Sequence, residues 1–212
     1  MKLALVLILP VFGFAQQTNF APATSGPATT LSPITPGQRA QWVIESTILP
    51  TNVLGNALGA GIETGLNSPK ELGTHWTGFQ KRYVNSMATG ALSNGIEAGV
   101  GALWGEDPRY LPAAAGTSLK GRVMRTAKWT FMAANSDGTM HPAYARFIAI
   151  PAANGLSNIW RPDSETDFDH FAERTALGFA GHLGGNAWNE FWPDVKKKVL
   201  HKGSGSGPFA GL

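Results

Sequence analysis

The chain has 212 residues and no cysteine, and its 17 basic residues only slightly outnumber its 14 acidic ones. The absence of cysteine excludes disulfides, thiol catalysis and thiolate metal sites. Such a weak positive surplus argues against nucleic-acid binding, which relies on a dense basic stripe. The length is sufficient to bury a core without covalent cross-links.

The N-terminus has the pattern of a secretory signal. Lys2 precedes an apolar run over residues 3–14, and Gly13 and Ala15 are the small residues that a signal peptidase reads. A membrane anchor is the alternative, but about a dozen apolar residues are fewer than the roughly 20 that span a bilayer. We therefore expect residues 1–15 to be a signal peptide cleaved after Ala15, and the protein to be periplasmic or outer-membrane associated.

The next segment is predicted to be a disordered leader. Residues 16–34 are rich in Pro and Thr and contain few large apolar groups that could offset chain entropy. A helical domain over residues 35–201 begins at Thr35, where Gln38 completes a capping box, and residues 202–212 form a flexible Gly/Ser tail. The first helix carries an apolar repeat and should stop at Pro50.

Helical periodicity continues along the domain. It predicts further helices over residues 53–66, 79–104, 118–134, 143–160 and 165–191. A second capping box opens a short turn at Ser68, and a turn signal lies at residues 135–138. Pro151 should kink one helix and Pro193 should end another. Because no segment alternates with a period of two, the predicted class is all-α, a single compact bundle of about six helices.

Four of the predicted helices have a recognisable apolar side. The residues that define these sides are Ala40, Ile44 and Ile48; Leu54, Leu58 and Ile62; Tyr83, Ile96, Val100 and Leu103; and Val123, Ala127 and Phe131.

Small residues recur four positions apart in three helices. The pairs are Gly55/Gly59, Gly61/Gly65, Gly95/Gly99 and Gly181/Gly185. Each helical glycine costs roughly 1 kcal/mol relative to alanine, so we expect close helix packing to compensate. The favoured interpretation is tight packing in a water-soluble bundle. The alternative is a membrane-inserting or membrane-associated protein that uses these small-residue faces.

Polar stripes follow the same helices. They comprise Asn56, Glu63 and Asn67; Ser93, Asn94, Glu97 and Gly101; and His182, Asn186 and Asn189. The stripes can be solvated faces, a structural hydrogen-bond network, or a site at which Glu63, Glu97 and His182 meet to transfer protons or hold a metal. The solvated face is favoured. The five histidines lack zinc spacing, and we expect neither a metal nor a cofactor.

The most distinctive string is residues 105–110, Gly-Glu-Asp-Pro-Arg-Tyr. Gly105 is suited to ending a helix, and Asp107-Pro108 to beginning a turn. The functional alternative is that Glu106, Asp107, Arg109 and Tyr110 bind a sugar or a peptide. The structural interpretation is favoured because Gly and Pro already account for the local geometry.

The order of these motifs resembles an uncharacterised family of exported soil-bacterial helical proteins. The shared features are the string at 105–110, Arg122, the Asp137-Gly138 break, residues 155–158 and a closing Phe191-Trp192-Pro193-Asp194. The chain departs from the family at residues 159–162, Ile-Trp-Arg-Pro, where other members have Tyr-Pro. The resemblance implies export and a helical domain, and it implies no catalytic residue.

Three functional hypotheses follow. The leading one is a non-enzymatic cell-envelope protein with a structural or interaction role. The second is a helical protein associated with the membrane surface or inserted in it. The third is a cell-wall hydrolase with Glu97 or Glu106 as the general acid. The sequence identifies neither a partner nor an oligomeric state.

Overall fold

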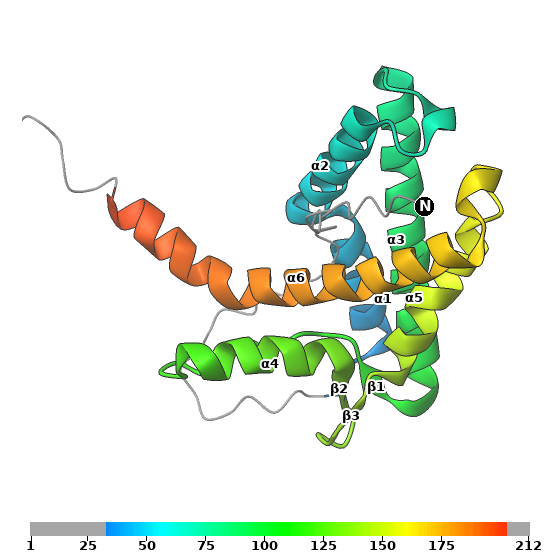
Figure 1. Cartoon of the computed structure of the whole chain (residues 1–212). Coiled ribbons are helices and arrows are strands. Elements are labelled where there is room, and N and C mark those ends of the chain that lie inside the picture. Colours follow the sequence, from blue (N-terminus) through cyan, green and yellow to red (C-terminus); the bar gives the residue numbers. More distant parts are fainter. Residues whose placement is uncertain (1–32, 203–212) are drawn as a thin grey trace, which may run out of the picture.

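The computed structural model describes residues 33–202, without the side chains of residues 50, 51 and 198–202. The chain is mostly helical (Figure 1). Its elements in chain order are α1 (Pro36–Ile48), α2 (Pro50–Leu66), η1 (Lys70–Leu72), α3 (Trp76–Trp104), β1 (Glu106–Asp107), α4 (Leu119–Phe131), β2 (Met132–Asn135), β3 (Met140–Pro142), α5 (Tyr144–Ser157), η2 (Asp163–Glu165) and α6 (Phe168–Lys202). The predicted signal peptide and nearly all of the predicted leader and tail lie outside the described residues.

The predicted start of the first helix is confirmed. The amide of Gln38 donates to the Thr35 hydroxyl at 3.3 Å, and the Gln38 side chain accepts from the Thr35 amide at 2.9 Å. Pro36 occupies the first turn, where its missing N–H leaves no intrahelical bond unmade. Local sequence therefore determines where α1 begins.

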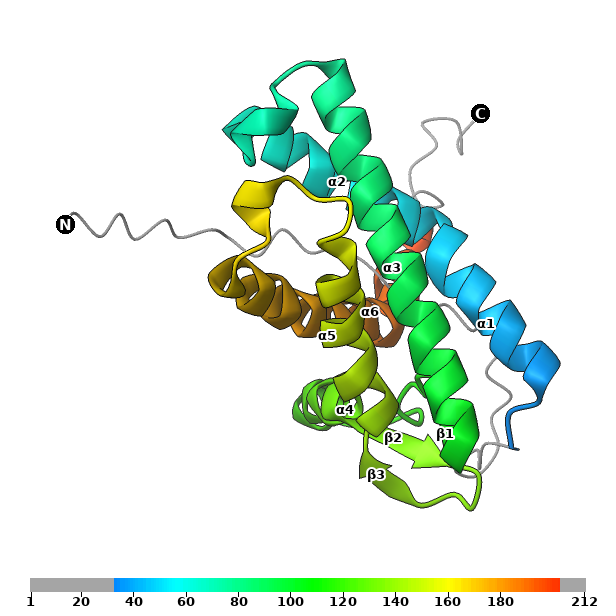
Figure 2. The same cartoon turned by 90° about the vertical axis from the view of Figure 1, so that its right-hand side faces the viewer.

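The helices form two groups that cross. Figure 2 shows α3 between α1 on one side and α5 on the other, and α2 also packs against α3. α4 and α6 lie side by side and run across this group (Figure 1). α3 is therefore the central helix, and side chains from α1, α2 and α5 meet along it.

The all-α prediction is wrong in one respect, because the described residues include a small antiparallel sheet with the strand order β1-β2-β3. β2 and β3 form a hairpin that closes through the predicted turn, with Gly138 in the left-handed region at φ 81°. β1 adds to β2 with Glu106 opposite Asn135. The chain therefore leaves α4 at Phe131, earlier than helical periodicity predicts.

The predicted end of the last helix is also wrong. α6 does not stop at residue 191 but continues through Pro193 to Lys202. Proline removes one backbone hydrogen bond from a helix, which bends it without necessarily ending it. Arg122 of α4 holds the residues on both sides of this proline, because it pairs with Glu190 and with Asp194.

The glycines differ in what they contact. Gly101 lies where α3 meets α5, and a Cβ there would be 3.4 Å from the Cβ of Ala145. By contrast, a Cβ on Gly61, Gly65, Gly95 or Gly99 would have no heavy atom within 4 Å. Close packing of the Gly61/Gly65 and Gly95/Gly99 pairs is therefore a wrong prediction, since these glycines face outward.

Candidate functional site

The centre of the molecule contains a buried ion pair between Glu97 of α3 and Arg146 of α5. The Arg146 Nε and Nη2 atoms donate to the Glu97 Oε1 at 3.1 and 2.9 Å. Both residues are at most 2% exposed. Burial raises the pKa of Glu97 above its ordinary value, and the charge of Arg146 opposes that rise. The pair therefore joins two helices at a point that water does not reach.

Arg146 also binds the end of α4. Its Nη1 donates to the carbonyl oxygens of Trp129 and Thr130 at 2.8 and 2.9 Å. The last carbonyls of a helix have no intrahelical partner, and a cation there also interacts favourably with the helix dipole. A single guanidinium thus connects α3, α4 and α5.

His182 lies on α6 close to this guanidinium. It is 4% exposed, and its Nε2 has no hydrogen-bond partner among the described residues. Burial, together with the positive charge of Arg146, lowers the pKa of His182 well below its ordinary value. One turn further along α6, the Asn186 side chain donates to the Thr130 hydroxyl at 3.2 Å.

The neutral state of His182 predicts a pH-dependent stability. At low pH the unfolded chain binds a proton that folded His182 excludes. The free energy of unfolding therefore has its full value above about pH 6.5 and decreases as the pH falls toward the lowered pKa of His182. The free energy of unfolding decreases by about 1.4 kcal/mol per pH unit, or roughly 3–6 °C in Tm for a chain of this size. Thermal unfolding of the wild type and of His182→Asn between pH 7.5 and 5.5 measures it, and the variant should have the shallower slope.

A matched control uses an exposed histidine. His75 is exposed, and its side chain makes no capping bond, so His75→Asn should keep the wild-type slope. If His182→Asn also kept that slope, the assignment of the neutral form to His182 would be incorrect.

The string at residues 105–110 turns inward. Gly105 ends α3 in the left-handed region at φ 79°, as predicted. The Glu106 Oε2 accepts from the Trp104 Nε1 at 2.9 Å and from the Ala145 amide at 3.2 Å. The Glu106 carbonyl accepts from the Arg39 Nη2 at 2.6 Å. Glu106 is therefore held in the junction between α1, α3 and α5.

The other candidate binding residues of this string also have partners within the protein. Asp107 accepts from the Arg109 Nε at 2.9 Å and from the Arg109 amide at 3.0 Å, in addition to their ion pair. The Tyr110 hydroxyl donates to the Glu190 Oε2 at 2.7 Å. Burial and this carboxylate raise the pKa of Tyr110 far above its ordinary value. These contacts give the string a structural role.

Glu190 is a site residue that sequence reasoning missed. Its carboxylate accepts from Tyr110, from the Ala113 amide at 2.9 Å and from the Arg122 Nε at 2.7 Å. The guanidinium of Arg122 also lies over the Phe191 ring, 4.6 Å from its centroid. Glu190 follows Asn186 by four residues, so a longer polar stripe on this helix would have included it.

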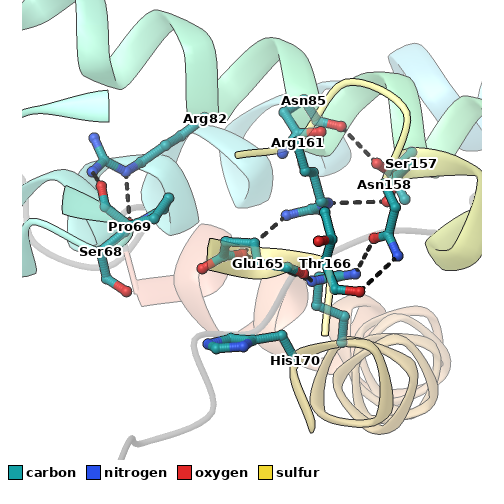
Figure 3. Close-up of polar contacts among 12 residues, drawn as sticks. Ser68, Pro69, Arg82, Asn85, Ser157, Asn158, Arg161, Glu165, Thr166 and His170 are labelled. Carbon is teal, nitrogen blue, oxygen red and sulfur yellow. Dashed lines mark hydrogen bonds and ion pairs between the residues drawn. The ribbon is translucent and has the colours of Figure 1, made fainter. Parts of the chain in front are cut away.

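A second polar network lies where α2, α3 and the α5–α6 connection meet (Figure 3). Arg82 of α3 donates from Nε to the Ser68 carbonyl at 2.8 Å and from Nη2 to the Pro69 carbonyl at 2.7 Å. Its Nη1 donates to the Gly73 carbonyl at 2.7 Å. Arg82 therefore fastens the connection between α2 and α3 onto α3.

The α5–α6 connection is held in a similar way. Arg161 donates to the Ser157 hydroxyl at 3.0 Å and pairs with Glu165 at 3.4 Å. Arg174 of α6 pairs with the same Glu165 at 3.8 Å and donates to the Asn158 side chain at 2.6 Å. Glu165 is thus shared between two arginines.

The three predicted candidates for chemistry do not meet in one site. Glu97 and His182 both lie near Arg146, but Glu63 is exposed on α2, where its charged neighbours include Arg161 and Arg82. Within the described part of the chain, no group of three or more His, Asp or Glu side chains could hold a metal. The arrangement of Glu97 and His182 around an arginine is that of a structural network.

The interior is more polar than the predicted helix faces imply. The buried polar residues are Arg39, Ser46, Asn52, Asn56, Arg82, Ser93, Asn94, Glu97, Glu106, Asp107, Thr126, Thr130, Arg146, Asn154, Ser157, His182, Asn186 and Glu190. Among the described residues, the large apolar side chains that are buried are Trp42, Tyr110, Trp129 and Ile150. The favoured expectation that the polar stripes face water is therefore wrong for α3 and, at His182 and Asn186, for α6, whereas the stripe on α2 is divided, with Asn56 buried and Glu63 exposed.

The outer surface carries the large apolar residues instead. Those exposed on α1, α2 and α3 are Ile44, Ile48, Leu54, Leu58, Ile62, Leu66, Trp76, Val84, Leu103 and Trp104. Those exposed on α4, α5 and α6 and their connections are Leu119, Val123, Met124, Phe131, Tyr144, Phe147, Ile148, Leu156, Ile159, Trp160, Phe168, Leu177, Leu183 and Val195. We call this set the apolar exterior. Several members belong to the predicted apolar sides, which therefore point outward.

No helix of the described region combines the length and the apolar character needed to cross a membrane. Comparison with family models, with curated proteins and with solved structures found no match to the chain. The resemblance to a family of exported helical proteins therefore stays a prediction.

Proposed function

We propose that this chain is an exported, non-enzymatic protein of the cell envelope that associates with a lipid membrane through its apolar exterior. The observation that carries the proposal is the inverted polarity of the helices. Soluble monomers rarely expose large contiguous apolar patches, and such patches mark contacts with a membrane or with another protein. The proposal joins the cell-envelope location and non-enzymatic role of the first sequence hypothesis to the membrane association of the second.

α2 illustrates this inversion. Asn52, Asn56 and Ala60 are buried against the protein, whereas Leu54 and Leu58 on the opposite side are more than 60% exposed. Burying one leucine fully is worth about 1.5–3 kcal/mol. Water would therefore favour the opposite orientation of this helix, while an apolar solvent favours the observed one.

The distribution of charge supports the same conclusion. Residues 46–62 contain no charged side chain. The only charged residue between 83 and 105 is Glu97, and the only one between 144 and 160 is Arg146. Both are buried and paired with each other. Charged groups in a lipid-exposed structure are expected to face the interior and to pair in this way.

The other hypotheses have less support. A general acid must reach the oxygen of its substrate, and Glu97 and Glu106 are buried and engaged with Arg146, Trp104 and Ala145. A second copy of the chain could cover an apolar face. However, the apolar exterior extends over all six α-helices of the described residues 33–202. A surrounding lipid covers such a surface more completely than one partner protein does.

The experiment compares extraction and flotation. The full chain, expressed with its own N-terminus, is expected in the membrane fraction, to resist extraction by high salt and to dissolve in mild detergent. The purified protein should float with vesicles of phosphatidylethanolamine and phosphatidylglycerol. Recovery of the mature protein in the soluble fraction without detergent would overturn the proposal, and a defined soluble oligomer there would indicate a second copy as the occupant.

A variant on α2 tests the surface directly. Replacing Leu54, Leu58 and Leu66 by Gln should weaken partitioning into vesicles by roughly 100-fold or more, because each exposed leucine contributes about 1 kcal/mol or more when covered by lipid. The control places Gln at the exposed positions Thr74, Thr77 and Ser136, which carry no apolar surface of this size. Equal flotation of the two variants would contradict the role of the leucines.

A further inference from the structure

A groove of about 540 Å³ lies between the first half of α3, η1 and the α5–α6 connection. The residues that line it are mostly apolar, Leu72, Val84, Ala88, Trp160 and Pro162, and three are polar, Gln80, Lys81 and Asn85. This volume falls within the range of small-molecule sites, about 300–1,000 Å³.

Two polar networks give the groove a fixed shape. On one side, the bonds from Arg82 to the backbone of the α2–α3 connection hold the segment that carries Leu72. On the other side, Arg161 and Glu165 hold the segment that carries Trp160 (Figure 3). The indole Nε1 of Trp160 also donates to the Asn85 Oδ1 at 2.6 Å, which fixes two of the lining residues relative to each other. The site is therefore preformed, which lowers the ordering cost of binding.

The charge of the lining selects the chemistry of a ligand. Among the described lining residues, Lys81 is the only charged one, and it is exposed. An apolar groove beside one ammonium fits a molecule with a hydrocarbon chain and an anionic group. A small water-soluble anion would leave the apolar walls uncovered.

An aromatic series marks the same end of α3. Trp76 stacks on Phe79 with centroids 4.9 Å apart, and Phe79 stacks on Tyr83 with centroids 6.1 Å apart. Trp76 is 67% exposed. Trp and Tyr side chains are enriched at the headgroup level of membranes, and basic pockets at that level bind anionic headgroups.

We propose that this groove binds one anionic phospholipid, with an acyl chain along Val84, Ala88 and Trp160 and the phosphate at Lys81. The inference rests on the proposed membrane association and names its preferred lipid class. Lys81 determines the preference for negative charge, whereas the apolar walls bind an acyl chain of any phospholipid.

The experiment measures retained lipid by native mass spectrometry of the full chain in neutral detergent. Phosphatidylglycerol and phosphatidylcholine with identical acyl chains are titrated in parallel. We expect phosphatidylglycerol to bind at least fivefold more tightly, because one lysine near an anionic headgroup contributes about this factor. Lys81→Gln should abolish the preference, Lys81→Arg should keep it, and Lys120→Gln on α4 should leave it unchanged.

A second variant tests the walls. Ala88→Trp fills the groove and should reduce binding of both lipids at least tenfold, whereas Ala102→Trp, at another exposed position on α3, should not. An unchanged lipid preference in Lys81→Gln, or unchanged binding in Ala88→Trp, would overturn the inference. Flotation with phosphatidylcholine vesicles separates the two proposals, because Lys81→Gln should float like the wild type even if the groove binds no lipid.

Discussion

Glu97→Ala is expected to lower the free energy of unfolding by about 3–5 kcal/mol, because it leaves the charge of Arg146 buried without its partner. This loss corresponds to roughly 6–20 °C in Tm. The measurement is thermal unfolding in mild detergent, followed by circular dichroism. Glu97→Gln should cost less, since an amide oxygen can still accept from the guanidinium.

A double variant separates the ion pair from packing. Glu97→Leu combined with Arg146→Met removes both charges and keeps similar volumes, so much of the loss should be recovered. The double variant should remain somewhat less stable than the wild type, because the carbonyls of Trp129 and Thr130 lose the Arg146 Nη1 donor. A double variant less stable than both single variants would show that the pair does not act as a unit.

Arg82→Met is expected to have the second large effect, a decrease of about 3 kcal/mol or more in the free energy of unfolding. Arg82 is 2% exposed, and its guanidinium supplies the donors for three backbone carbonyls in the α2–α3 connection. Each buried acceptor left without a donor costs about 1–3 kcal/mol. Hydrogen exchange of residues 68–78 should become faster, in addition to the fall in Tm.

The conservative change Arg82→Lys tests whether the planar shape of the guanidinium matters in addition to its charge. Lys keeps the positive charge but lacks the planar fork that reaches several carbonyls, so Arg82→Lys should recover less than half of the loss. Exchange outside residues 68–78 serves as the internal control. If Arg82→Lys were as stable as the wild type, charge alone would account for the role of Arg82.

Local signals predicted much of the helical framework. The capping box of Thr35 and Gln38, the glycine that ends α3 and the turn at residues 135–138 are each confirmed. Such features depend on bonds between residues a few positions apart, so a short stretch of sequence contains all the information. The stop expected at Pro193 does not occur, and the residues on both sides of this proline, Glu190 and Asp194, pair with Arg122 of another helix, which a local signal does not contain.

Features that depend on distant partners were not predictable in this way. β1 has two residues, too few for an alternating pattern, and it forms only because β2 lies beside it. Glu190 was missed because its donors, Tyr110 and Arg122, lie about 70–80 residues earlier. Glu97 and His182 were named from the sequence, but their shared neighbour Arg146 was not.

The sequence by itself determined that helices such as α1, α2 and α4 have an apolar side and a polar side, because side-chain periodicity follows from helix geometry. Only the tertiary structure decided which side points inward. A polar side chain can be buried at low cost when a partner satisfies it, and partners such as Arg146 for Glu97 lie 49 residues away. Periodicity does not contain that information, so the orientation of the helices, and with it the apolar exterior, depended on contacts made only in the folded chain.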